Sequence, residues 1–153
     1  MEQYIAQTSR GLVDVLEAEI KELGLNIISK SSIGVLFESD LRGCYQANLM
    51  LRTATRIIRP VMEFDAPTIQ SLYDNIKKHD WTQYIDVKGT LALDTTVRDT
   101  QIFRDQRYVT LKLKDGIVDQ FREKYDERPD IDSENPELRI MVRVVQNHVS
   151  IAV

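Results

Sequence analysis

Cysteine and histidine are scarce in this 153-residue sequence, which contains Cys44, His79 and His148 and no others. One cysteine cannot form an internal disulfide, and three scattered residues do not supply the four ligands of a structural zinc site. No apolar run approaches the ~20 residues that span a bilayer, and the first residues lack the basic and then apolar layout of a signal peptide. These absences exclude a disulfide-stapled domain, a zinc module and a membrane-spanning protein, and they predict a cytoplasmic location.

Patterns that indicate catalysis are missing as well. No strand-like run is followed by the glycine-rich turn that binds a dinucleotide. Ser150 lies near His148, but two residues on one strand are not a triad. The segment 127–137 lacks the glycine and the spacing of a calcium loop, so we interpret it as a solvated acidic loop. Its acids are Glu127, Asp130, Asp132, Glu134 and Glu137. The residues therefore predict no catalytic site and no metal site in this chain.

The first 65 residues show the pattern of a small α+β domain. Apolar residues recur at helical spacing after Ser9 and after Asp40, and either residue can cap a helix. Strand-like runs flank both helices. The expected elements are a strand at 3–8, a helix at 9–24, strands at 25–30 and 34–39, a helix carrying Leu41, Tyr45 and Leu49, and a strand at 55–65. The order β-α-β-β-α-β is that of the ferredoxin-like fold.

A second pattern begins near Ala66, where we expect a domain boundary. A helix is predicted first, with Ile69, Leu72 and Ile76 at helical spacing. The later elements are a strand at 90–97, a long helix that ends near Tyr125 and carries Leu113, Ile117 and Phe121, and a hairpin of 138–145 and 148–153 joined by Gln146-Asn147. The sequence thus predicts two α+β domains, 1–65 and 66–153. Because the last strand has no polar exit, we expect that a longer protein continues beyond it.

Positive charge is concentrated between residues 98 and 114, although the formal net charge of the chain is −4. This stretch contains two acids and five cations, which are Arg98, Arg104, Arg107, Lys112 and Lys114. If a helix begins after residue 104, cations and exposed backbone N–H groups converge at its N-terminus, where a phosphate is favoured. A solvated helix face, whose lysines pair with Asp115 and Asp119, explains the same residues.

Two arginines and two aromatic residues extend this hypothesis. Arg139 and Arg143 are four residues apart on a predicted strand, so both point to one face and form a second basic pair. Ordinary surface arginines would show the same spacing. Phe103 and Tyr108 lie beside the cations and are candidates for stacking on a base, or for the core.

Four segments of the sequence also resemble the N-terminal part of bacterial 23S rRNA guanine-N2 methyltransferases. They are TSRGLVDVLEAEIKELG, HDWTQYI, RDQRYVTLKLKDGIVDQFREKYDERPDID and PELRIMVRVVQNHVSIAV. The resemblance covers essentially the whole chain and is most specific from 103 to 153. It implies that 1–65 form a ferredoxin-like domain and that 66–153 form a THUMP domain, an RNA-binding α/β module.

The resemblance also implies a division of labour. S-adenosylmethionine would bind in a downstream catalytic domain, whose Asn/Asp-Pro-Pro motif is absent here, since the one Asn-Pro pair, Asn135-Pro136, precedes Glu137. The present chain would hold structured RNA, in particular 23S rRNA, without catalysing methylation itself and without a cofactor of its own. The RNA contacts would come from Arg98, Arg104, Arg107, Lys112, Lys114, Arg139 and Arg143. The alternative is a protein-interaction or regulatory ferredoxin-like module that does not bind RNA.

Overall fold

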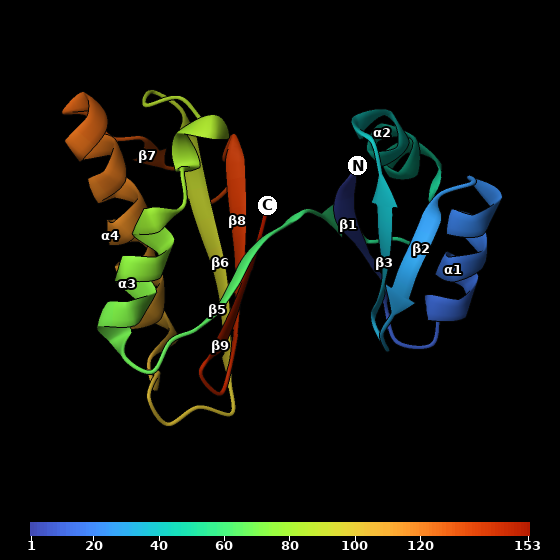
Figure 1. Ribbon diagram of the computed structural model, residues 1–153, viewed down its shortest axis with the longest axis horizontal. Helices are drawn as coiled ribbons and strands as arrows, with labels where there is room; N and C mark the ends of the chain where they lie inside the picture. Colours follow the sequence, from blue (N-terminus) through green and yellow to red (C-terminus); the bar gives the residue numbers. More distant parts are fainter. The chain divides into compact units, whose positions relative to one another are not determined.

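The structure, a computed structural model, describes all residues from Met1 to Val153 and consists of two compact units. The first comprises Met1–Pro60 and the second Val61–Val153. Each unit has its own sheet and its own hydrophobic core (Figure 1). None of the helices combines the length and the apolar character that crossing a bilayer requires.

The first unit has the β-α-β-β-α-β order that the sequence predicts. Its elements are β1 (Glu2–Gln7), α1 (Val13–Glu22), β2 (Asn26–Lys30), β3 (Gly34–Ser39), α2 (Leu41–Met50) and β4 (Arg56–Ile58). The strands form an antiparallel sheet in the order β2-β3-β1-β4. Side chains of β1 and β3, among them Tyr4 and Phe37, form one core with Leu16 of α1 and Ala47 of α2. Both helices therefore pack on the same face of the sheet, as in the ferredoxin-like fold.

Helix α2 begins where the sequence predicts but turns its apolar residues outward. Asp40 caps it, accepting a 2.8 Å hydrogen bond from the Gly43 N–H. The side packed on the sheet consists of Gly43 and Ala47, and a Cβ at position 43 would collide with Ser39. Because this close approach admits only small residues, the larger ones lie on the solvent side. Leu41, Tyr45 and Leu49 are 61%, 60% and 83% exposed.

The prediction of a single strand at 55–65 is wrong, because the structure divides this segment into two strands that belong to different sheets. Its first part is β4 beside β1, and its second part is β5 (Pro60–Asp65), which lies next to a strand of the second unit. Pro60 has no N–H to donate, so the ladder with β1 cannot continue through it. The second compact unit consequently starts with β5. The boundary of an independently folding domain near Ala66 stays a prediction.

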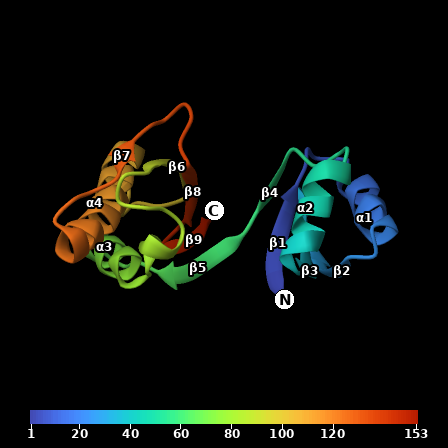
Figure 2. The ribbon, with the colours of Figure 1, turned by 90° about the horizontal axis from the view of Figure 1, so that it is seen from above.

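The second unit is a mixed sheet with both helices on one side, as Figures 1 and 2 show. After β5 follow α3 (Ile69–Lys78), the 3-10 helix η1 (Trp81–Gln83), β6 (Thr90–Arg98), α4 (Gln106–Tyr125), β7 (Asp130–Ile131), β8 (Leu138–Val145) and β9 (His148–Ala152). The strand order is β5-β9-β8-β6-β7. β6 pairs in parallel with β7 and β8, whereas β8 and β9 form the predicted antiparallel hairpin. β7 is a two-residue strand within the segment that we expected to be only a loop.

The core of this unit joins α3, α4 and the sheet. Leu113, Ile117 and Phe121 of α4 are fully buried, which confirms the helical stripe read from the sequence. The buried Gln120 amide donates to the carbonyl oxygens of Lys77 and His79 and accepts from the backbone N–H of Trp81. One side chain of α4 therefore satisfies three backbone groups where α3 ends.

Gly116 sets how closely α3 and α4 pack. A Cβ at this position would lie 2.5 Å from Cγ2 of the fully buried Ile76 and 3.1 Å from the carbonyl oxygen of Tyr73. We predict that Gly116→Ala lowers the free energy of unfolding by about 1–2 kcal/mol, because overpacking outweighs the ~1 kcal/mol that alanine contributes to helix propensity. Urea denaturation measures the change. Asp115→Ala, at the neighbouring exposed position, is the control, and a Gly116→Ala variant as stable as the wild type would contradict the prediction.

Candidate nucleic-acid interface

The end of β6 is held in place where the cationic stretch begins. Arg98 is the last residue of the strand, and its carbonyl oxygen accepts a 3.0 Å hydrogen bond from the N–H of Gln146 at the tip of the β8–β9 hairpin. Asp99 follows with a φ of 52°, a left-handed conformation that turns the chain out of the sheet. The arrangement fixes the position from which the loop to α4 departs.

The loop 99–105 is held by short side chains and by one aromatic anchor. The Thr100 hydroxyl accepts hydrogen bonds from the N–H groups of Ile102 (3.2 Å) and Phe103 (3.4 Å). The Phe103 side chain is 2% exposed and belongs to the core, so it cannot stack on a base. Tyr108, the other aromatic candidate, is 49% exposed.

Helix α4 begins at the end of this loop with its N-terminus accessible. The Asp105 carboxylate caps the helix by accepting a 2.9 Å hydrogen bond from the N–H of Arg107. The first turn contains no acidic residue. The partial positive charge of the helix N-terminus adds to the arginine charges around it, and the capping Asp105 carboxylate offsets part of that sum.

A shallow cleft of about 220 Å³ lies at this junction between β6 and α4. Its lining residues are Val97, Arg98, Asp99, Thr100, Phe103, Arg104 and Gln106. The cleft brings Arg98 and Arg104 together, and both side chains are exposed. Nε of Arg104 donates to the carbonyl oxygen of Gln101 at 3.3 Å, which orients the guanidinium group. Asp99 offsets part of the positive charge.

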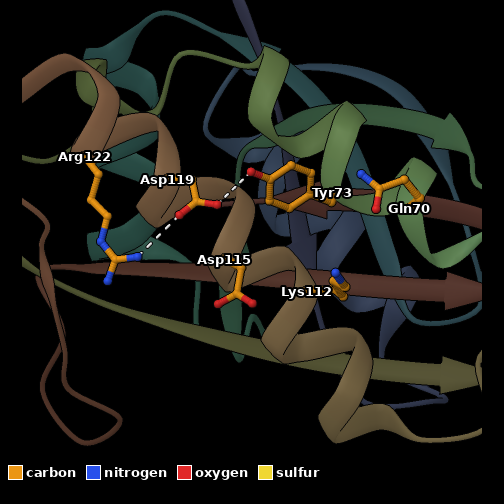
Figure 3. A pocket seen from close by; sticks show the side chains of 6 residues that line it. All are labelled: Gln70, Tyr73, Lys112, Asp115, Asp119 and Arg122. Carbon is orange, nitrogen blue, oxygen red and sulfur yellow. Dashed lines mark hydrogen bonds and ion pairs between the residues drawn. The ribbon is translucent and has the colours of Figure 1, made fainter.

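The other cations of the stretch lie on two edges of α4. Arg107 is exposed and Lys114 is half-buried, and their seven-residue spacing places them on one side of the helix. Lys112 lies elsewhere, in a second cleft of about 390 Å³ between α3 and α4 (Figure 3). Its Nζ is 5.8 Å from the centre of the Tyr73 ring. The remaining side chains of that cleft are Gln70, Asp115, Asp119 and Arg122.

The second cleft contains charges of both signs. The Tyr73 hydroxyl donates a 2.7 Å hydrogen bond to Asp119, and the same carboxylate lies 3.4 Å from Arg122 (Figure 3). The hydrogen bond to Asp119 and burial raise the pKa of Tyr73. With charges of both signs, this cleft does not offer the field that a phosphate requires.

The arginines of β8 differ in their contacts. Nη1 of Arg139 lies 2.9 Å from Oδ2 of Asp94, and Nη2 donates to the carbonyl oxygen of Ser133 at 3.2 Å, so this side chain fastens the acidic loop to the sheet. Arg143 is exposed. The register pairs Arg98 with Val145, two residues after Arg143, so Arg98 and Arg143 point to the same face of the sheet.

His148 begins β9 and lies between two acids of β5. Its Nδ1 is 2.9 Å from Oδ1 of Asp65, and its Nε2 is 3.6 Å from Oε2 of Glu63. The hydrogen bond to Asp65 is the main cause of a pKa above the usual value, and the charges of both acids raise it further. Asp65 precedes His148 by 83 residues, so only the placement of β5 beside β9 reveals the cluster. Thr100 and Gln106, which also line the cleft at the start of α4, were not predicted as site residues, because neither carries a charge and only the turn after β6 brings them there.

We predict that His148 titrates above about 6.5, the usual midpoint of histidine. A group with a raised pKa in the folded state contributes stability that is fully present below its unfolded pKa and is lost as the pH rises through the folded pKa. The attachment of β5 to β9 should therefore weaken as the pH rises above about 6.5. NMR titration of the His148 ring gives the midpoint. Asp65→Asn should lower it, and an unchanged midpoint in this variant would contradict the assignment.

Comparison with known proteins gives matches over both units. Residues 66–153 match the family model described as THUMP domain, and residues 3–58 match the model described as RlmL ferredoxin-like domain. Two relatives are named ribosomal RNA large subunit methyltransferase K/L. The one from Magnetococcus marinus is 37% identical over 96% of this chain, and the one from Syntrophotalea carbinolica is 31% identical over 98%. The chain spans about a fifth of their length, 20% and 21% respectively.

A solved structure supports the fold. The crystal structure of a possible methylase from Clostridium difficile superposes with a TM-score of 0.82 and covers 99% of this chain, which in turn covers 40% of that protein. The sequence identity is 24%, so the likeness is one of fold. The THUMP-domain match and the superposition both include the residues of the cleft at the start of α4, whereas the ferredoxin-like match ends before them.

Proposed function

Because the chain belongs to the THUMP-domain family and carries a ferredoxin-like domain of the RlmL type before its THUMP domain, we propose that it binds structured RNA. The observation that carries the proposal is the cleft at the junction of β6 and α4, where Arg98 and Arg104 meet the N-terminus of a 20-residue helix. Phosphate oxygens suit such a site, since guanidinium groups and backbone N–H groups donate hydrogen bonds and the helix dipole attracts negative charge.

The cations differ in their exposure and in the partners that they already have, so we expect them to contribute unequally to RNA binding. Arg98 and Arg104 would contribute most, because both are exposed and line the cleft. Arg107, which is exposed on the first turn of α4, would add a contact at the start of the helix. Lys114 and Arg143 would add contacts along the helix and on the sheet face that Arg98 shares. Lys112 and Arg139 would contribute least, since Lys112 lies among acids and Arg139 is engaged by Asp94.

Affinity should be modest for this chain alone. Its net charge of −4 gives no long-range attraction for a polyanion, and only the few cations within about one Debye length of the RNA, ~8 Å at physiological salt, would attract it. The site would therefore orient RNA that is also held by another part of the protein. Modest affinity of this kind suits a domain that orients RNA for another domain.

The longer protein would be a methyltransferase. The two relatives are named rRNA large subunit methyltransferases and are about five times the length of this chain, which supports a parent protein that methylates large-subunit ribosomal RNA. That the RNA is 23S rRNA, that the target is guanine N2 and that the location is the cytoplasm are parts of the proposal that come from the sequence resemblance alone. S-adenosylmethionine would bind in a catalytic domain that follows. The present residues would contribute RNA positioning and no group to the chemistry.

The division of labour predicts how the isolated chain behaves towards the cofactor. Without a glycine-rich turn after a strand, it has no cradle for the methionine and ribose groups of S-adenosylmethionine. Calorimetry with the 153-residue chain should therefore give no binding heat at millimolar cofactor. Stoichiometric binding in the micromolar range would contradict the proposed division.

The RNA site predicts a specific decrease in affinity. Arg98→Ala combined with Arg104→Ala should weaken the binding of a structured 23S rRNA transcript about 5- to 30-fold at low salt, if each exposed charge contact contributes about 0.5–1 kcal/mol. The slope of log K against log salt should flatten by about two units, one for each phosphate that the variant no longer neutralises. Filter binding at several salt concentrations measures both quantities.

The matched control is Lys78→Ala combined with Lys88→Ala. It removes two exposed charges of the same unit outside the cleft, whereas Lys77 is unsuitable because it pairs with Glu123. An equal decrease in both double variants would mean that overall charge, and not the cleft, holds the RNA. No binding by the wild type at low salt would refute the RNA proposal itself.

A further inference from the structure

The outward side of α2 is an apolar stripe without a partner in the first unit. Leu41, Tyr45 and Leu49 follow one another at four-residue steps, with exposed fractions of 61%, 60% and 83%. Met50, at the end of the helix, is 58% exposed. Large apolar side chains exposed together on one helix face, and not singly, are a mark of an interaction surface.

The composition of this helix restricts its partner. α2 contains no acid and a single cation, Arg42, and its N-terminal cap Asp40 is engaged by Gly43. A surface so poor in charge offers nothing to RNA phosphates. It fits a second apolar surface instead.

The stripe is also symmetric about Tyr45. Leu41 and Leu49 lie four residues to either side, and Arg42 has Asn48 as its counterpart three residues away on the other side. We propose that α2 packs antiparallel against α2 of a second copy of this chain, with the two-fold axis at Tyr45. Each Leu41 then lies against the partner's Leu49, and the two Tyr45 rings face each other.

Three physical features favour this arrangement. Residues four apart form a ridge, and ridges of this type from two helices interdigitate in the commonest class of helix packing. A two-fold axis places the same patch on both partners, so a palindromic stripe complements itself. Arg42 meets the partner's Asn48 and not another cation, and the antiparallel helices bring each N-terminus near the partner's C-terminus, where their dipoles attract.

The size of the surface sets the strength of the dimer. Ten helical residues span only about 15 Å, so one face of α2 buries less than the roughly 800 Å² per partner of a standard stable interface. We therefore expect a reversible dimer with a dissociation constant of roughly 10 µM to 1 mM, on the order expected of small interfaces. Because the contact rests on apolar burial and not on charge pairs, added NaCl should not weaken it, in contrast to RNA binding. The inference does not depend on the proposed function, because all its residues lie outside the second unit.

Charge exchange at Tyr45 tests the axis directly. In the dimer this residue faces itself, so Tyr45→Lys and Tyr45→Glu should each weaken self-association at least tenfold by placing like charges opposite each other. An equimolar mixture of the two variants should recover association to within about threefold of the wild type, because the unlike charges then pair. Sedimentation equilibrium of the 153-residue chain from about 10 µM to 1 mM measures all three, and circular dichroism verifies folding.

The control is Leu111→Lys, which changes an apolar side chain of α4 that is 49% exposed. It should leave self-association unchanged. A chain that stays monomeric throughout this concentration range would overturn the proposal and leave the stripe to a different partner. A dimer that persists in both Tyr45 variants, or variants that fail to associate when mixed, would equally overturn it.

Discussion

The parallel pairing of β6 with β8 is the constraint from which the second unit takes its form. A tight turn cannot join two neighbouring parallel strands, so the chain must leave the end of β6, cross one face of the sheet and return. α4 makes this crossing, and its 20 residues extend about 30 Å, close to the ~26 Å of the eight paired residues of the two strands. The N-terminus of α4 must therefore lie at the carboxyl end of β6.

This corner, the junction of the end of β6 with the start of α4, forms the cleft that Arg98 and Arg104 line. Strand ends and helix starts that meet at one sheet edge are the usual location of binding sites in α/β folds. Here the corner is closed by the loop 99–105, and the hairpin tip braces it through the hydrogen bond from Gln146 to Arg98. Topology supplies the helix N-terminus, and the local sequence supplies the arginines. The acidic balance of the whole chain matters less, because salt screens charges that lie farther away than about one Debye length.

Local patterns in the sequence were sufficient to predict most elements, but not which face or sheet each residue joins. The long helix could be predicted with its buried residues, since Leu113, Ile117 and Phe121 repeat over several turns. The stripe of α2 has the same spacing and points outward, because Gly43 and Ala47 permit a closer approach that spacing alone does not reveal. Likewise, the cations between 98 and 114 could be recognised as a cluster, yet the side chain of Lys112 lies against Tyr73 of α3. Arg139 forms an ion pair with Asp94 of β6, and a local sequence pattern does not predict this pairing of strands.

The left-handed turn at Asp99 and the cap at Asp105 give the loop between them two anchored ends. Phe103 is the one large side chain between these ends that the core requires, so positions 101, 102 and 104 can vary without disturbing the packing beneath them. On the proposed RNA-binding role of this corner, related proteins would be free to differ in the nucleic acid that they prefer while they keep the same scaffold, since surface loops tolerate change far better than cores. A loop of different sequence engineered into this segment would need to keep the turn at Asp99, the Thr100 hydroxyl, the aromatic anchor Phe103 and the cap Asp105.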